Sequence, residues 1–202
     1  MQETKAQSER RGFDRVTSLN EAAKELISRS FRVDLLALDA MVQSKRGGGS
    51  LRGFDEVSSQ MRSWSRDLHR ELEELRHLSR EVVVNVSTAS KEDHLLRLLA
   101  RAAASTGDEL ATKAVALRET GQTERGQQLN VRWRRVLSSL GDLDQLGMMA
   151  VVLSRSAMIE ASSGNPEQRA QLNDVSQEFY RNSEAVVAVL KALLKVMRQA
   201  EP

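Results

Sequence analysis

The glycine-rich segment between Arg46 and Phe54 constrains this chain more than any other feature. Four glycines, Gly47, Gly48, Gly49 and Gly53, fall within seven residues. Because glycine adopts backbone angles that other residues avoid, this cluster predicts a tight reversal of the chain. Long helical patterns run into the segment and out of it, so it predicts the tip of an antiparallel helical hairpin.

Apolar side chains on both sides of this tip recur at steps of three and four residues. Before the tip they are Phe31, Leu35, Leu38 and Val42. After the tip they are Phe54, Val57, Met61, Trp64, Leu68, Leu72 and Leu75. This spacing places each set on one stripe of its helix. Two such stripes joined by a short turn predict a long antiparallel hairpin.

Composition extends this prediction to the whole chain. Only two of the 202 residues are proline, and aromatic residues make up 3%. Such a chain favours long helices over a β-rich globule. We therefore predict an all-α protein: a long antiparallel helical hairpin with a glycine-rich tip, packed as a helical bundle or coiled coil.

Breaks in the apolar pattern predict the domain organisation. We expect a flexible N-terminus over 1–12, a hairpin over 13–86 with helices 13–46 and 54–86, and a C-terminal helical bundle segment over 91–200. Small, cap-forming residues over 85–91 favour a break there; the alternative is one helix that runs straight through them. Further turns are predicted at 119–123 and at 163–166, where Gly164, Asn165 and Pro166 form a stop-and-start signal.

The segment 31–62 is similar to the signalling tip of bacterial methyl-accepting chemotaxis receptors, with no gap in the spacing. The matching residues are Phe31, Leu35, Leu36, Ala37, Leu38, Ala40, Val42, Arg46, Gly48, Arg52, Gly53, Phe54, Val57 and Arg62. The resemblance implies that hairpin tips contact one another through Phe31, Leu35, Leu38 and Val42, with Arg46 and Arg62 nearby. It also implies that a histidine kinase and its coupling protein dock near Arg52, Phe54 and Val57.

Several positions depart from the receptor pattern. Gln43 and Gln60 stand where the family usually carries glutamates, and Glu56 stands where it presents an apolar residue to the kinase. A carboxylate does not enter an apolar groove cheaply without a partner. The departures are compatible with the hairpin shape and count against coupling to the usual kinase.

For each group of residues that could carry chemistry, a purely structural role explains the pattern better. His69, Glu73 and His77 share a helix face but fit the solvated flank of a coiled coil better than a metal site. Trp133, between Arg132 and Arg134, fits a buried tryptophan better than a phosphate patch. With no cysteine, three histidines and no cofactor fingerprint, we predict no catalytic residues, no metal and no cofactor. The acidic pair at 108–109 is a loose match to a methylation site.

The favoured hypothesis is a cytoplasmic, non-enzymatic, chemoreceptor-like signalling protein that acts through its hairpin tip. Its expected partners are a chemotaxis-type histidine kinase or coupling protein and further copies of itself, with no nucleic acid and no membrane span. One alternative is a structural or adaptor bundle. The other is a small-ligand sensor with a cavity near Gly141, Gly147, Met148, Met149 and Met158.

Overall fold

The computed structural model describes residues 2–46, 51–106, 109–163 and 166–198. Nearly all of these residues lie in four helices, and none of them lies in a strand. The helices are α1 (Gln2–Arg46), α2 (Arg52–Thr106), α3 (Glu109–Ala161) and α4 (Pro166–Arg198). The predicted all-α fold is confirmed.

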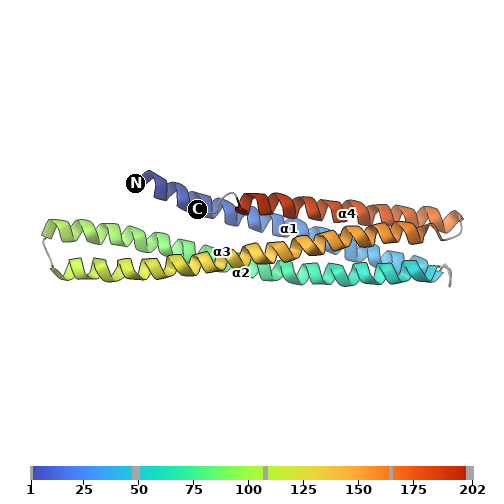
Figure 1. Ribbon diagram of the computed structural model, residues 1–202, viewed down its shortest axis with the longest axis horizontal. Coiled ribbons are helices and arrows are strands. Elements are labelled where there is room, and N and C mark those ends of the chain that lie inside the picture. Colours follow the sequence, from blue (N-terminus) through green and yellow to red (C-terminus); the bar gives the residue numbers. More distant parts are fainter. Residues whose placement is uncertain (1, 47–50, 107–108, 164–165, 199–202) are drawn as a thin grey trace.

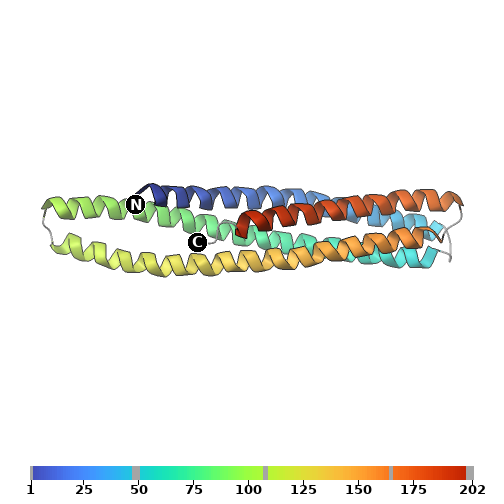
Figure 2. The ribbon, with the colours of Figure 1, turned by 45° about the horizontal axis from the view of Figure 1, so that its top comes forward.

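The helices alternate in direction and form an elongated antiparallel bundle (Figure 1). The reversal between α1 and α2 lies at the same end as the reversal between α3 and α4, and α2 joins α3 at the other end. Each helix packs on the next along the chain, and α4 closes the ring by packing on α1. Helices α1 and α3 therefore occupy diagonal corners, which the turned view separates (Figure 2).

The core follows a heptad pattern in every helix. Along α2 the buried positions recur at steps of four and three residues: Phe54, Ser58, Met61, Ser65, Leu68, Leu72, Leu75, Ser79, Val82 and Val86. The same rhythm runs along α3 and α4. This repeat is the signature of knobs-into-holes packing in coiled coils and helical bundles. The predicted bundle is thus built from four regular heptad seams.

The break predicted at 85–91 is wrong, and the alternative of one continuous helix is confirmed. Helix α2 runs unbroken through this segment. The Asn85 amide donates to the carbonyl of Glu81 at 2.6 Å, and the Thr88 hydroxyl donates to the carbonyl of Val84 at 2.8 Å. Polar side chains that suit a helix cap are here satisfied within the helix instead.

The other predicted boundaries fare unevenly. The turn expected at 119–123 is wrong, because these residues lie inside α3; α2 ends at Thr106 and α3 begins at Glu109. The stop-and-start signal at 163–166 is confirmed, since α3 ends at Ala161 and α4 begins at Pro166. The N-terminal segment expected to be flexible is helical from Gln2. The glycines 47–49, Gly107 and Gly164 lie outside the described residues.

Helix α4 is shorter than its neighbours, so within the described residues part of the bundle lacks a fourth helix. The last turns of α4, near Leu193 and Val196, lie beside Ser18 and Ala22 of α1. Beyond that level, half-buried Trp133 packs against the core, and the guanidinium of Arg15 lies 5.5 Å from its ring centre. The prediction of a buried Trp133 is met in part, because its side chain packs against the core but stays half-exposed.

Candidate interaction surface

Four apolar side chains of α1 form an outward-facing row near the hairpin tip. Phe31 is 63% exposed, Leu35 50% and Val42 48%, and Leu38 is half-buried. Large apolar side chains on a monomer's surface matter when they are contiguous, because such patches mark interaction sites. We call Phe31, Leu35, Leu38 and Val42 the α1 stripe.

The opposite side of α1 is the side that packs into the bundle. Its buried residues along the same turns are small or of moderate size: Ser30, Val33, Ala37, Ala40 and Ser44. The neighbouring helices supply the bulk, since the two largest fully buried side chains are Phe54 and Phe179. The α1 stripe, which the resemblance assigns to contacts between tips, is therefore not the side of α1 that packs into the bundle. Small residues leave room for large ones from facing helices.

Serine hydroxyls fix this orientation of α1. Ser65 donates to the carbonyl of Ser30 at 2.5 Å, and Ser44 donates to the carbonyl of Leu51 at 3.1 Å. Arg62 adds an ion pair to Asp34, with 3.3 Å between Nε and Oδ1. These contacts tie α1 to Leu51 and α2 through residues other than the stripe, and they leave the α1 stripe on the exposed side of α1.

The remaining residues of the predicted site are divided between the surface and the core. Arg46 and Arg52 are exposed, and Arg62 is half-buried in its ion pair. Phe54 is fully buried and Val57 is 9% exposed. Helix α3 lies against this part of α2, where a side chain at Gly53 would run into the carboxylate of Glu160. A docking partner cannot reach Phe54 or Val57 while the bundle is closed.

The positions that depart from the receptor pattern form local pairs on the helix surfaces. The Gln43 amide donates to the carboxylate of Asp39 at 2.8 Å. The Gln60 amide donates in the same way to the carboxylate of Glu56 at 3.0 Å. Both pairs join residues four apart on one helix, which is a stabilising spacing. Glu56 is exposed, so its charge stays in water rather than in the core.

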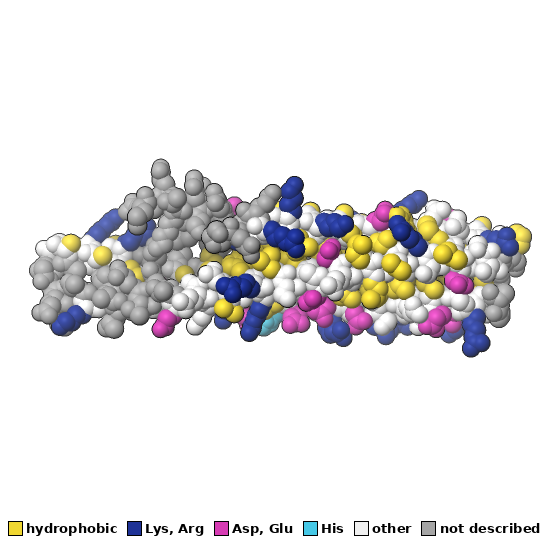
Figure 3. All heavy atoms as spheres, viewed as in Figure 1, with side chains coloured by type: hydrophobic (Ala, Val, Ile, Leu, Met, Phe, Trp, Pro, Cys, Tyr) yellow, Lys and Arg dark blue, Asp and Glu magenta, His cyan; other side chains and the backbone are white. Residues whose placement is uncertain are grey.

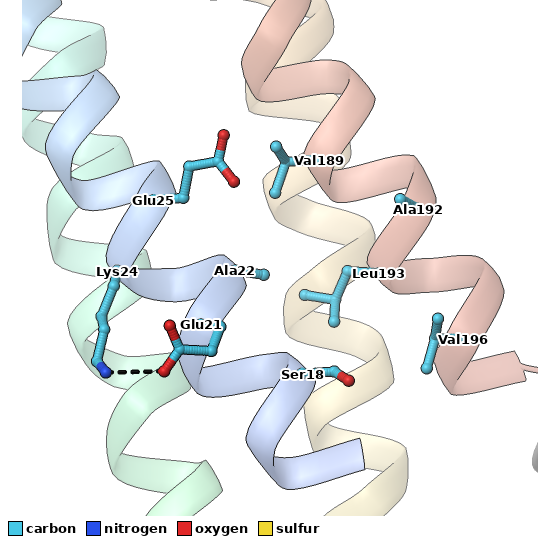
Figure 4. Close-up of a pocket in the computed structure, with 9 residues that line it drawn as sticks. All are labelled: Ser18, Glu21, Ala22, Lys24, Glu25, Val189, Ala192, Leu193 and Val196. Carbon is cyan, nitrogen blue, oxygen red and sulfur yellow. Dashed lines mark hydrogen bonds and ion pairs between the residues drawn. The ribbon is translucent and has the colours of Figure 1, made fainter. Parts of the chain in front are cut away.

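A shallow groove of about 630 Å³ lies between α1 and α4 (Figure 4). The α4 side is apolar, with Val189, Leu193 and Val196. The charged groups on the α1 side pair locally: Lys24 lies 2.8 Å from Glu21, and Glu25 is paired with Arg29 at 2.7 Å. The groove therefore offers apolar surface but no convergent set of polar groups of the kind that fixes a small ligand.

The region proposed for a ligand cavity is closely packed at Gly147, whereas a Cβ atom at Gly141 would meet nothing within 4 Å. A Cβ atom at Gly147 would lie 3.1 Å from Cγ2 of Val187 and 3.4 Å from Cδ1 of Leu190. Met148 and Met149 point outward and are exposed. Gly147 thus lets α3 and α4 approach closely, and it does not open a cavity between them.

Sequence reasoning missed the apolar outer face of α3. Its exposed residues Met148, Met149, Val152 and Ile159 belong to a segment, Glu124–Ala161, that is apolar and long enough to cross a membrane by length and composition alone. Only 28% of its most apolar window is buried inside the bundle. The signal was present in the sequence as apolar residues on every side of the predicted helix.

The predicted helix face with His69, Glu73 and His77 is part of the solvated surface. Glu73 accepts from Arg76 at 2.8 Å, and Nδ1 of His77 lies 3.7 Å from Glu81. Among the residues that the structure describes, no three histidine or acidic side chains are grouped to hold a metal ion. The acidic pair at 108–109 falls at residues whose side chains are not described.

No protein-family model matches this sequence, and no curated protein matches it at a significant level. The proposed function therefore rests on the exposed surfaces described above and on the resemblance of 31–62 to chemotaxis receptors.

Proposed function

We propose that this chain is a receptor-like signalling protein that binds other proteins through the α1 stripe near its hairpin tip. The observation that carries this proposal is the outward position of Phe31, Leu35 and Val42. Three large apolar side chains lie in water along the turns 30–44 of α1, whose buried side is made of small or moderate-sized residues. A rigid helix that presents apolar residues at steps of three and four is suited to enter a partner's groove.

Two further observations support the proposal. The exposed residues are the same ones through which the resemblance to chemotaxis receptors implies contacts between tips. The bundle also places two hairpin turns at one end (Figure 1). In the receptors, a four-helix arrangement of this kind is made by two hairpins from separate chains, whereas here one chain supplies both.

The expected partners are a chemotaxis-type histidine kinase or its coupling protein. By resemblance they would dock near Arg52, Phe54 and Val57, but the bundle buries Phe54 and Val57, so we assign their contact to the α1 stripe. The direct test is sedimentation of the purified chain with such a kinase and coupling protein. The double variant Phe31→Ser/Leu35→Ser removes the centre of the stripe and leaves the core intact. We expect it to weaken the complex at least tenfold.

The matched control is Val84→Ser, because Val84 is an apolar residue of α2 that is 64% exposed and lies far from the tip. The control should bind as the parent does. Equal binding by the parent and the double variant would refute the role of the stripe.

A structural or adaptor bundle is the second candidate function. It is favoured by the burial of Phe54 and Val57, the residues at which the kinase would dock by resemblance. If the parent chain fails to bind the kinase and the coupling protein at all, the adaptor function takes its place.

A further inference from the structure

A second apolar patch lies on the outer face of α3. Met148 is 52% exposed, Met149 55%, Val152 61% and Ile159 69%. On the face shown in Figure 3, hydrophobic side chains gather over the half of the bundle that holds the two hairpin turns. We call Met148, Met149, Val152 and Ile159 the α3 patch.

The α1 stripe and the α3 patch lie at the same height along the bundle. Ser65 bonds to Ser30 of α1, and its neighbour Trp64 donates to the carbonyl of Leu146 on α3 at 2.7 Å. Residues 30 and 146 are therefore level with each other. Nearer the tip, Ser44 bonds to Leu51, and Glu160 lies against Gly53. Residues 44 and 160 are level as well. The segments 31–42 and 148–159 therefore occupy the same stretch of the bundle axis.

The two apolar surfaces face opposite ways. Each helix packs on its sequence neighbours and α4 packs on α1, so α1 and α3 are diagonal across the bundle. The outer faces of diagonal helices point away from each other. Both helices also run toward the tip (Figure 1). A copy placed beside another with the same orientation brings one α1 stripe against the other's α3 patch.

The charges around the two surfaces are complementary. Next to the α1 stripe lie the exposed cations Arg32, Lys45 and Arg46, with Asp39 as the exposed carboxylate among them. Along α3 itself, the turns 142–160 around the α3 patch carry three carboxylates, Asp142, Asp144 and Glu160. They carry one cation, Arg155, whose guanidinium lies 5.8 Å from the ring centre of Tyr180 on α4. Packing two α1 stripes together would instead bring like charges together.

We infer that the α3 patch is the docking surface for the α1 stripe of a second copy of this chain. The inference rests on the same exposed stripe as the proposed function and adds a partner for it. The contact is heterologous, because different surfaces of the two copies meet. Since the surfaces face opposite ways, the contact does not close on itself, and successive copies form a side-by-side row.

A membrane is the other surface that an apolar helix face contacts. The three carboxylates around the α3 patch disfavour binding to an anionic membrane, because anionic lipid headgroups repel acidic side chains and attract basic ones. Each surface spans only 12 residues, about 18 Å at 1.5 Å per residue. A contact this small belongs to the weak class of interfaces, so assembly should depend strongly on protein concentration.

Sedimentation velocity across micromolar to millimolar concentrations tests the inference with two double variants. One is Phe31→Ser/Leu35→Ser, which disables the α1 stripe, and the other is Val152→Ser/Ile159→Ser, which disables the α3 patch. All four side chains are exposed, and far-UV circular dichroism checks that each variant keeps the parent's helicity. We expect the parent to form successively larger species and each variant to stay monomeric.

An equimolar mixture of the two variants is the decisive sample. The stripe of one variant and the patch of the other remain intact, so the mixture should form dimers and stop there. Val84→Ser should assemble like the parent. The inference is overturned if Val152→Ser/Ile159→Ser assembles like the parent, if the mixture stays monomeric, or if the parent is monomeric throughout.

Vesicles of phosphatidylcholine and phosphatidylglycerol provide the membrane comparison. We expect the parent not to co-sediment with them. Co-sedimentation that the Val152→Ser/Ile159→Ser variant loses would assign the α3 patch to lipid and overturn the inference. In either case that variant retains the α1 stripe, so its binding to the histidine kinase tests the proposed function separately.

Discussion

Serine is the commonest buried polar residue among those that the structure describes, and its environments differ. Ser154 donates to the carbonyl of Ala150 at 2.6 Å and lies 2.9 Å from the hydroxyl of Ser183 on α4. Ser58 is equally buried, but its hydroxyl has no hydrogen-bond partner within the described part of the chain. An unsatisfied buried hydroxyl costs about 1–3 kcal/mol, whereas a satisfied one contributes to stability.

The contrast predicts opposite effects of the same substitution. Ser58→Ala removes an unsatisfied group and should raise the free energy of unfolding. Ser154→Ala breaks the contact to Ser183 and should lower it. We expect the two variants to differ by about 1–2 kcal/mol, measured by urea denaturation. Equal stabilities would mean that the Ser58 hydroxyl is hydrogen-bonded in solution.

Glycines within α3 provide a second residue-scale test. A side chain at Gly141 meets no other atom within 4 Å, while one at Gly147 meets Val187. Alanine in a helix is favoured over glycine by about 1 kcal/mol, but at Gly147 that gain is offset by the close contact. Gly141→Ala should be more stable than Gly147→Ala by about 1 kcal/mol or more. If Gly147→Ala raises the free energy of unfolding more than Gly141→Ala does, α4 moves aside without cost to accommodate the added methyl group.

At the scale of single helices, α1 shows how far an apolar pattern can be read. The spacing of Phe31, Leu35 and Val42 correctly predicts a helix, but it does not identify the buried side. Residues Ser30, Val33 and Ala37 have the same spacing, offset by one or two positions, and they are the buried ones. Which side packs depends on the bulk supplied by the other helices, and a local pattern does not contain that information.

Substitutions on the two sides of α1 should therefore have unequal effects. Ala37→Leu forces a larger side chain into a filled core and should destabilise the bundle by about 1–3 kcal/mol. Leu35→Ala removes a larger, half-exposed side chain and should change stability by about 0.5 kcal/mol or less. Thermal or urea unfolding measures both. The opposite ranking would place the stripe in the core.

Helix boundaries were predictable only where backbone chemistry determines them. Pro166, which cannot continue the preceding helix, marks the start of α4 as expected. Polar and small residues over 85–91 carry no such constraint, because their side chains bond to the helix's own carbonyls. The heptad seam of Ser79, Val82 and Val86 also runs on into this segment, and its packing holds the helix together.

At the scale of the whole molecule, two hairpins lie side by side with their turns at one end (Figure 2). This pairing buries the apolar residues of α2 that sequence reasoning offered to a partner, and it leaves apolar residues of α1 and α3 in water. The all-α fold, the hairpin tip and the final turn were predictable. The two proposed interaction surfaces were only half predictable, since the α1 stripe lies within the segment that resembles the receptors and the α3 patch lies outside it.

The outward orientation of both surfaces is the central claim, and cysteine accessibility tests it most directly, because the natural sequence contains no cysteine. Single cysteines at Leu35 and Val152 should react with a maleimide at the rate of an exposed thiol, in dilute protein where copies are apart. Cysteines at Ala37 and Ser154, which are fully buried, should react roughly a hundredfold more slowly, since they wait for the bundle to open. The arrangement would be contradicted if the cysteine at Ala37 reacts as fast as the one at Leu35, or faster. It would equally be contradicted if the cysteine at Ser154 reacts as fast as the one at Val152, or faster.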